Sequence, residues 1–254
     1  MFKVILTALA LTAAVIVTFQ VTSKTDPKNH LLTRRECIDC DFKGVDFSGA
    51  DLSGVNLTYS DLSEANLQGA NLQGAKLSSP PAQFGNGTTN LGKANLQGAN
   101  LSHVDFSGSN LKAANLSHAN LQAANLSAVN LSGALLSKAD LRNIQIGSRR
   151  KTNMVGADLR DTNLSGLNMS HMSLKNANLK DVNLKGTDLS WAGLDNVNLA
   201  GANLSDTNLT GTMLANASLS GTSIETAIIC QTTMPDNSVS YRDCPEKAPT
   251  AWHR

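Results

Sequence analysis

The sequence predicts an all-β fold in which the chain winds into square coils of 20 residues. A large apolar residue recurs every five residues over most of 37–229, as in the stretch NLQGANLQGAKL at 66–77. A small or β-branched residue usually stands two positions before it, with Asn, Asp or Ser between them. Only 4% of the chain is aromatic, so the core must be thin and built mainly from Leu and Ala.

Neither regular element accounts for a five-residue period. On an α-helix, five residues turn about 500°, so successive leucines would spiral around the helix by about 140° each. On a flat strand, successive leucines would alternate between the two faces. A chain that makes a quarter turn every five residues instead directs each Leu and each small residue to the axis, and each Asn or Asp outward.

Successive coils are expected to stack about 4.8 Å apart, the spacing of paired strands. Residues 20 apart then lie above one another, and outward asparagines can hydrogen-bond from coil to coil. Four leucines and four Ala-sized side chains fill the tube, in which larger groups would not fit. The expected outward ladder contains Asn163, Asn183 and Asn203, and the inward one contains Leu164, Leu184, Leu204 and Ile224.

The repeated motif [Ala/Val/Thr]-[Asn/Asp]-Leu-x-x resembles that of the pentapeptide-repeat family. It covers nearly all of 37–229, about 36 units or nine coils. The resemblance implies a right-handed quadrilateral β-helix, which at this coil number is a rod roughly 43 Å long. A solenoid of this kind is stabilised by stacking between neighbouring coils and needs covered ends.

The first 24 residues differ from the rest. The segment 4–21 has no charged residue and lies between Lys3 and Lys24. It is typical of a signal peptide or of an uncleaved signal anchor, and it is at the short limit for a spanning helix. Both alternatives predict an extracytoplasmic protein, in the periplasm, in the thylakoid lumen, secreted, or anchored to the membrane by 4–21. The membrane is a partner only through this segment.

A short capping helix is predicted over 25–36. Asp26 is suited to the N-cap and Pro27 to the first helical position. Leu31 and Leu32 would cover the open first coil. The stretch LLTRRECIDCDF, residues 31–42, resembles the opening of exported members of the family.

The segment 230–254 is predicted to be a C-terminal cap followed by a tail. The stretch IICQTTMPDNSVSYRDC, residues 228–244, resembles the closing segment of the same exported members, with its TTMPD motif. The resemblance implies a disulfide between Cys230 and Cys244 that ties a closing hairpin to the last coil.

Cys37 and Cys40 fall on inward positions of the first coil. They are interpreted as two buried thiols or as a local disulfide. A thioredoxin-like redox site would need a βαβ context, which is missing. A four-Cys zinc site would require the rod ends, roughly 40 Å apart, to meet. No metal and no cofactor is expected.

Two insertions interrupt the period and are candidates for contacts with a partner, because loops are where a rod can vary its surface. The insertion at 78–90 carries Phe84, and the insertion at 147–153 carries Arg149, Arg150 and Lys151. The alternative is that both are tolerated insertions, the second with solvated charges. Trp191, at an exposed corner, completes the candidate interaction surface.

No catalytic constellation is found. His103, His118 and His171 fall on corner or outward positions without a nucleophile or metal partner. The region 138–185 is basic, and Arg160 and Lys180 are expected to form cross-coil ion pairs with Asp161 and Asp181.

These observations favour a non-enzymatic, extracytoplasmic scaffold or protein-interaction surface with an unknown protein partner, present as a monomer or weak dimer. The alternative is a DNA mimic that inhibits or protects a type II topoisomerase, as some cytoplasmic members of the family do. The predicted export signal and a net charge of +1 disfavour it, because a DNA mimic needs a continuous acidic face. Binding to nucleic acid itself is not expected.

Overall fold

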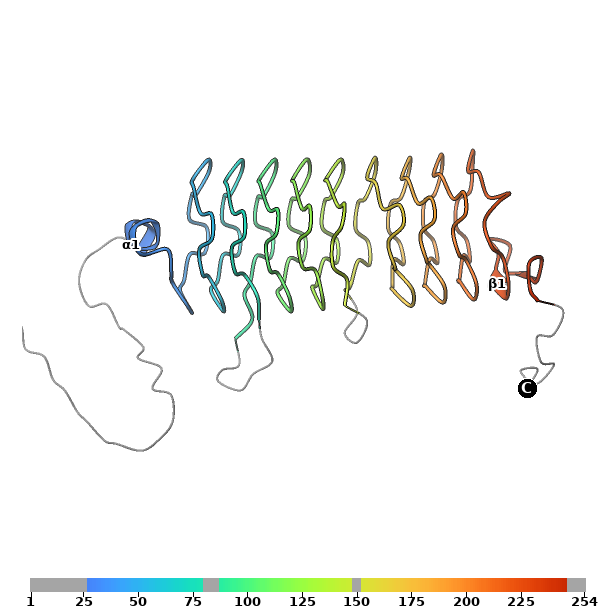
Figure 1. Cartoon of the computed structure of the whole chain (residues 1–254), viewed down its shortest axis with the longest axis horizontal. Helices are drawn as coiled ribbons and strands as arrows, with labels where there is room; N and C mark the ends of the chain where they lie inside the picture. The colour runs from blue at the N-terminus through green and yellow to red at the C-terminus, as the bar shows by residue number, and fades with distance from the viewer. Residues whose placement is uncertain (1–26, 80–86, 148–151, 246–254) are drawn as a thin grey trace, which may run out of the picture.

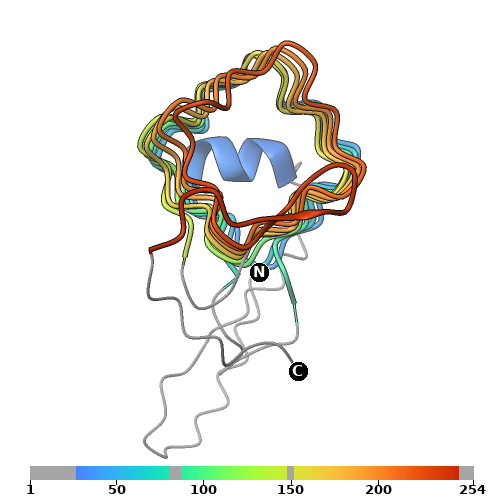
Figure 2. The ribbon, with the colours of Figure 1, turned by 90° about the vertical axis from the view of Figure 1, so that its right-hand side faces the viewer.

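The computed structural model of the protein describes residues 27–79, 87–147 and 152–245. The predicted leader 1–24 and the end of the tail, 246–254, lie outside these ranges. Figure 1 shows the described residues wound into a rod of stacked coils. Seen along its axis, the rod has a four-sided outline (Figure 2).

Each coil pairs with the next through parallel β-bridges, which join residues 20 apart outside the two insertions. In most coils the N–H of the inward Leu donates to the next coil, as Leu72 does to the carbonyl of Asn100 at 2.8 Å. The N–H of the outward residue usually donates to the preceding coil, as Asn71 does to Ala50 at 2.9 Å. Because a corner follows every bridge, the paired stretches stay too short to form extended strands.

The bridges form four ladders, which define four faces of the rod. Their first three described rungs are, for face A, Asp41, Asp61 and Asn90; for face B, Asp46, Asn66 and Asn95; for face C, Asp51, Asn71 and Asn100; and for face D, Glu36, Asn56 and Lys76. The corners between them are called AB, BC, CD and DA, in chain order.

The outward asparagines serve two partners at once, which explains their frequency. The side-chain amide of Asn183 donates to Oδ1 of Asn163 at 3.1 Å, and that of Asn203 donates to Oδ1 of Asn183 at 3.2 Å. The Oδ1 of Asn183 also accepts the N–H of Lys185 at 3.2 Å, across the following corner. The predicted external ladder is therefore confirmed, and each rung also fixes a turn.

The aligned leucines of the axis are buried, among them Leu164, Leu184 and Leu204. The expectation that only small residues fit the other inward positions is wrong in three places. Ile144, Leu167 and Met172 occupy positions that Ala, Val or Thr hold in most coils. Ile144 and Leu167 belong to adjacent coils of face D.

Helix α1 (Pro27–Arg34) lies at the N-terminal end of the rod, within the outline of the coils in Figure 2. Its Leu31 is fully buried in the core. The helix ends at Arg34, two residues before the expected boundary at 36, because Arg35 adopts a left-handed φ of 58° and Glu36 already bridges Asn56. The expected N-cap, Asp26, lies outside the described residues.

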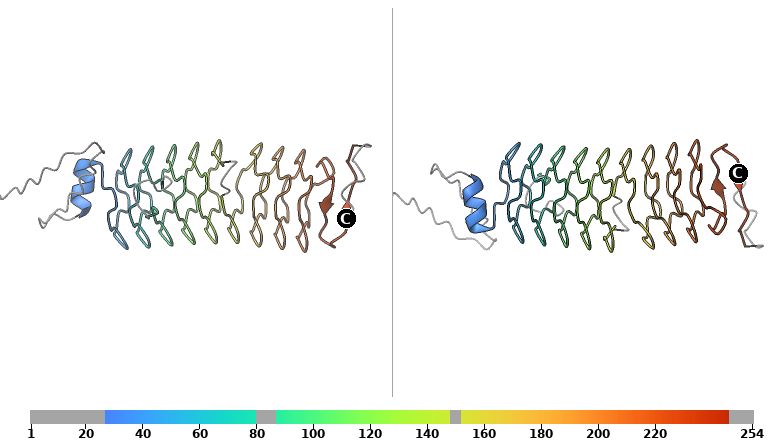
Figure 3. Two further views of the ribbon diagram at one scale, coloured as in Figure 1. Left: turned by 90° about the horizontal axis from the view of Figure 1, so that it is seen from below. Right: turned by 90° about the horizontal axis from the view of Figure 1, so that it is seen from above.

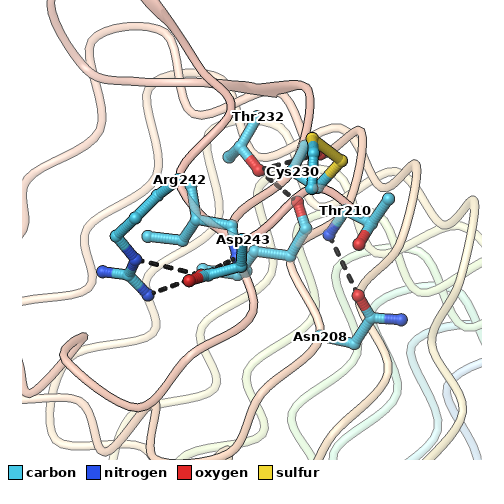
Figure 4. Close-up of a disulfide and its surroundings, with 9 residues drawn as sticks. Asn208, Thr210, Cys230, Thr232, Arg242 and Asp243 are labelled. Atoms are coloured by element: carbon cyan, nitrogen blue, oxygen red, sulfur yellow. Dashed lines mark hydrogen bonds and ion pairs between the residues drawn. A yellow bond between two sulfur atoms is a disulfide. The ribbon is translucent and has the colours of Figure 1, made fainter. Parts of the chain in front are cut away.

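The C-terminal end is closed by a two-stranded antiparallel hairpin of β1 (Thr232–Thr233) and β2 (Val239–Ser240). A disulfide joins Cys230 to Cys244, the pairing that the resemblance implied. Asp243 adds a second attachment, since its N–H donates to the carbonyl of Ile229 at 2.9 Å and its Oδ2 accepts the N–H of Ile229 at 2.8 Å. Figure 4 shows this carboxylate between Arg242 and the last coil.

The other end has its own disulfide, between Cys37 and Cys40. Of the two alternatives for this pair, the structure therefore has the local disulfide. Both residues are half-buried at the edge of the core.

Acid is expected to destabilise the first coils. Hydrogen bonds from the side chain and N–H of Ser53, and then from Arg35, lower the pKa of Asp51 from 3.8 to about 2. A carboxyl group whose pKa is lower in the folded state stabilises the fold above its unfolded pKa. We expect this contribution to be complete above about pH 4 and lost as the pH falls towards 2.

Urea unfolding near neutral pH, at about pH 4 and at about pH 2.5 measures this loss. An Asp51→Asn variant is the control, because it has no carboxyl group to titrate and should lose less stability over the same range. A larger free energy of unfolding at the lowest pH would contradict the assignment.

Candidate functional site

One edge of the rod, corner DA, differs from the other three along its whole length. Both insertions leave the rod there, since the first falls between Leu77 of face D and Leu91 of face A, and the second between Ile146 and Met154. The bridge Asp61–Asn90 spans 29 residues and the bridge Asn130–Asn153 spans 23, nine and three more than the regular 20. Both disulfides close at this corner as well.

The turn residues of corner DA are almost uncharged. Within the described ranges they include no Lys or Arg, and Asp39 is their only carboxylate. Corner BC, by contrast, holds Lys138, Arg160, Asp161, Lys180 and Asp181. The turn residues of corner DA are Ile38, Asp39, Thr58, Tyr59, Ser78, Ser79, Ser107, Gly108, Ser127, Ala128, Ser170, His171, Ser190, Trp191, Thr210, Gly211, Cys230 and Gln231.

Exposed apolar side chains gather at the C-terminal half of this edge. Trp191 is 50% exposed at the corner itself, while Met213 on face A and Ile228 on face D are 47% and 46% exposed. Both of these stand at outward positions that Asn or Asp usually holds. A partner that approaches corner DA here would meet three large apolar side chains within two coils.

The indole of Trp191 is held against the next coil. The backbone N–H of Trp191 donates to the carbonyl of Thr210 at 2.8 Å, and the indole ring lies over Gly211. A Cβ on Gly211 would come within 2.5 Å of two ring carbons. The absence of a side chain at 211 is therefore what lets the ring lie flat on the rod.

Replacing Gly211 by Ala is expected to displace the indole. The substitution also places a side chain at a left-handed φ of +67°, which costs about 1–2 kcal/mol. Gly133→Ala is the matched control, because Gly133 has the same φ and nothing within 4 Å of its Cβ.

Tryptophan fluorescence in a Trp252→Phe background measures the displacement. We expect the emission to shift in the Gly211 variant alone, with the larger loss of stability there. Equal emission and equal stability in both variants would show that the ring does not depend on Gly211.

The bases of the two insertions are fixed by hydroxyl groups. At the first, the N–H of Tyr59 donates to Oγ1 of Thr89 at 2.7 Å, and this hydroxyl donates to the carbonyl of Ser78 at 2.9 Å. At the second, the hydroxyl of Thr152 donates to the carbonyl of Leu126. The described ends of both insertions are thus anchored in the rod.

Four of the five predicted surface residues, Phe84, Arg149, Arg150 and Lys151, lie outside the described residues. The described ends of both insertions lie at the same corner as Trp191. The two insertions are three coils apart, about 14 Å, and the second is two coils, about 10 Å, from Trp191. The common corner could have been found from the sequence by counting both insertions against the leucine register.

The expected cross-coil ion pairs of the basic region are wrong. Arg160 pairs with Asp158 of its own coil at 2.6 Å, and Lys180 lies 3.7 Å from its neighbour Asp181. A side chain at the first turn position can fold back onto the outward carboxylate two residues before it, which is closer than the next coil. The hydrogen bond from Arg160 lowers the pKa of Asp158.

In the ranges that the structure describes, no group of three or more His, Cys, Asp and Glu could hold a metal ion. His103, His118 and His171 are exposed at corners with left-handed φ near 58–60°. None of the helices within the described ranges has the length and apolarity needed to cross a membrane.

This chain is similar to the solved structures of several proteins, of which three are described here. HetL, a pentapeptide repeat protein involved in heterocyst differentiation regulation from the cyanobacterium Nostoc sp. strain PCC 7120, is 27% identical over 81% of this chain and 91% of its own, with a TM-score of 0.37. QnrB1, a plasmid-mediated fluoroquinolone resistance protein, is 16% identical over 79% and 94%, with a TM-score of 0.33. A pentapeptide repeat protein from the Arabidopsis thaliana thylakoid lumen is 22% identical over 68% and 77%, with a TM-score of 0.14. These TM-scores are too low for the likenesses to inform on function.

No curated protein matches the chain significantly. A family model described as pentapeptide repeats matches it in eight copies, over 36–78, 89–127, 124–145, 152–190 and 192–229. The match covers most of the chain and the same residues as the bridged coils. The repeated motif, the parallel bridges and this match agree on a right-handed β-helix, and the chain belongs to the pentapeptide-repeat family.

Proposed function

We propose that the protein is a non-enzymatic, extracytoplasmic scaffold that binds a partner protein along corner DA. The observation that carries this proposal is the gathering of Trp191, Met213 and Ile228 at one edge whose described turn residues are nearly uncharged, beside the described ends of both insertions. Interfaces between proteins are enriched in aromatic residues and Met and depleted of charge at their centre. The other three corners carry charged turn residues, such as Lys93 at corner AB, Arg160 at corner BC and Lys185 at corner CD.

The extracytoplasmic location is supported by the cysteines. All four form disulfides, and such bonds persist in oxidising compartments such as the periplasm or thylakoid lumen. The predicted leader points the same way. A mass measurement of the mature protein shows whether this leader is cleaved or retained as an anchor.

The two ends support a solenoid of about nine coils that remains a monomer or weak dimer. In this proposal α1 covers the first coil through Leu31, and the closing hairpin covers the last. Covered ends prevent the sheet edges of two rods from pairing. Stacking between neighbouring coils then supplies the stability of the rod, without a role for metal or cofactor.

Fractionation of cells that express the full chain tests the location. We expect the protein in the envelope or lumen fraction, with no thiol available for alkylation. A cytoplasmic protein with four free thiols would overturn this part of the proposal and make a DNA gyrase supercoiling assay the next experiment.

Site-specific photo-crosslinking tests the edge. A photoreactive amino acid is placed at 191 or, as a control, at Asn216, an exposed residue of corner AB with a left-handed φ of 57°. With envelope or lumen extract of the source organism, we expect one protein to crosslink from 191 only. Equal crosslinking from both positions, or none from 191, would contradict a binding edge at corner DA.

A further inference from the structure

One junction between coils is open on two faces. The coil of 129–147 joins the next through six backbone hydrogen bonds on faces A and B, among them Leu131 to Asn153 at 2.8 Å and Leu136 to Asp158 at 2.7 Å. On faces C and D no backbone hydrogen bond joins the described residues 139–147 to 162–169. Bridges are likewise missing there between Asp140 and Asn163 and between Gln145 and Asn168.

The figures show the same asymmetry. In Figure 1 the coils are evenly spaced along the upper edge, whereas along the lower edge a wider gap separates the yellow-green coil from the yellow one. The wider spacing is also visible from above and below in Figure 3. The junction is therefore hinged on faces A and B and open on the opposite side.

The opening has a cause in the sequence. Ile144 and Leu167 stand one above the other at the inward position of face D that Ala124 and Thr187 hold in the neighbouring coils. Extra methyl groups in a close-packed interior force the surrounding backbone to move. Leu167 is only partly buried, as expected for a side chain that its own tube cannot accommodate.

The opening contains a cavity of about 300 Å³ lined by Leu141, Arg142, Asn143, Asn163, Ser165, Gly166 and Leu167. We call it the junction slot. Arg142 is the only ionisable residue of the lining, and its guanidinium already pairs with Asp140 at 2.6 Å. Lys185, at the same CD corner one coil further, forms none of the ion pairs of the described residues. The slot lining is therefore polar, and Lys185 adds one unpaired positive charge near it.

Both walls of the junction slot present unpaired backbone groups. By the pattern of the other coils, the N–H groups of Leu141 and Asn143 would donate to the carbonyls of Asn163 and Ser165. Within the described residues these two donors and two acceptors have no partner, and the N–H of Asn163 has none either. Donors and acceptors thus face the slot from opposite walls.

We propose that the junction slot binds an extended peptide segment of a partner protein that carries an acidic side chain. An extended backbone offers N–H and C=O groups to both walls, as in strand addition to an exposed sheet edge. An inorganic anion would satisfy the donors alone and leave the carbonyls of Asn163 and Ser165 unpaired. The acidic side chain is favoured by the unpaired cation of Lys185, whereas Arg142 is already neutralised by Asp140.

Insertion of a strand requires the two walls to stand about 9.6 Å apart, twice the spacing of paired strands. The bonds on faces A and B allow this opening without separating the coils. This site lies on faces C and D and at corner CD, so it is independent of Trp191. Its failure would leave the proposed binding edge unaffected.

The test is amide hydrogen exchange of the whole protein with defined peptides. The probes are the hexapeptide acetyl-TVEVTV-amide, its Glu→Lys counterpart, its backbone N-methylated form, and sodium sulfate. We expect the acidic peptide to slow exchange at 141–146 and 163–168 by about tenfold or more, the equivalent of one order of magnitude in an equilibrium constant. The other three probes should have much smaller effects.

A closed junction provides the matched control. Ile144→Ala combined with Leu167→Ala restores the small residues of other coils and should protect Leu141 and Asn143 without any peptide. Leu167→Thr, which copies Thr187 and Thr207, is a second variant should the first not fold.

Three results would overturn the proposal. The first is that the acidic peptide protects neither wall. The second is that sulfate or the N-methylated peptide protects as well as the acidic peptide does. The third is that the closed variants bind the acidic peptide like the parent protein.

Discussion

Replacement of both Cys230 and Cys244 by serine is expected to lower the free energy of unfolding by about 3 kcal/mol. The disulfide spans 14 residues of sequence, so the loop it closes loses considerable freedom in the unfolded chain. It also ties the closing hairpin to a coil whose far side has no further neighbour. In a solenoid each coil is stabilised by its neighbours, so the loss should begin at the C-terminal coil and extend inward.

Urea unfolding and hydrogen exchange measure the size and the place of this loss. Replacing Cys37 and Cys40 by serine is the control, because that pair spans only three residues and should cost roughly 2 kcal/mol, at the opposite end. The prediction is wrong if both double replacements lower the free energy of unfolding equally and hydrogen exchange rises evenly along the rod. The disulfides would then not act locally at its ends.

The second large effect is expected at Leu136. This side chain is fully buried on the axis, so Leu136→Ala should cost about 2–5 kcal/mol from lost burial and the cavity that remains. The tube is narrow and its coils are held at fixed spacing by hydrogen bonds on both sides. The neighbours therefore have little freedom to collapse into the space, which favours the upper part of that range.

Leu135 is the matched control, since it is the adjacent residue of the same type with the opposite orientation. It is 44% exposed at an outward position of face B, between Asn115 and Asp158. Leu135→Asn restores the usual outward residue and should change the free energy of unfolding by no more than about 0.5 kcal/mol. A comparable loss at both positions, measured by urea unfolding, would contradict the assignment of inward and outward residues.

The five-residue period predicted most of the architecture because it constrains every residue at once. A ladder such as Asn163, Asn183 and Asn203 follows from spacing alone, and the structure confirms it with side-chain hydrogen bonds. The pairing of Cys230 with Cys244 came from the resemblance of the closing segment and agrees with the structure. The register also predicts the exposure of Trp191.

The deviations were not predicted, because they depend on what a side chain does when it departs from the pattern. Ile144 and Leu167 obey the apolar pattern, and only their size distinguishes them from the Ala, Val or Thr at the same position of most coils. Whether such a coil stretches, bends or opens depends on packing in three dimensions. Arg160 was expected to pair with a carboxylate of a neighbouring coil. Spacing along the rod does not show that its side chain folds back to Asp158 of its own coil instead.

The open junction also has a mechanical meaning. A pull along the axis loads all the hydrogen bonds between two coils in parallel, and at most junctions all four faces share the load. At the junction after Ile146 only faces A and B do so. Under tension the rod should therefore part there first, into an N-terminal and a C-terminal stack, each with its own disulfide.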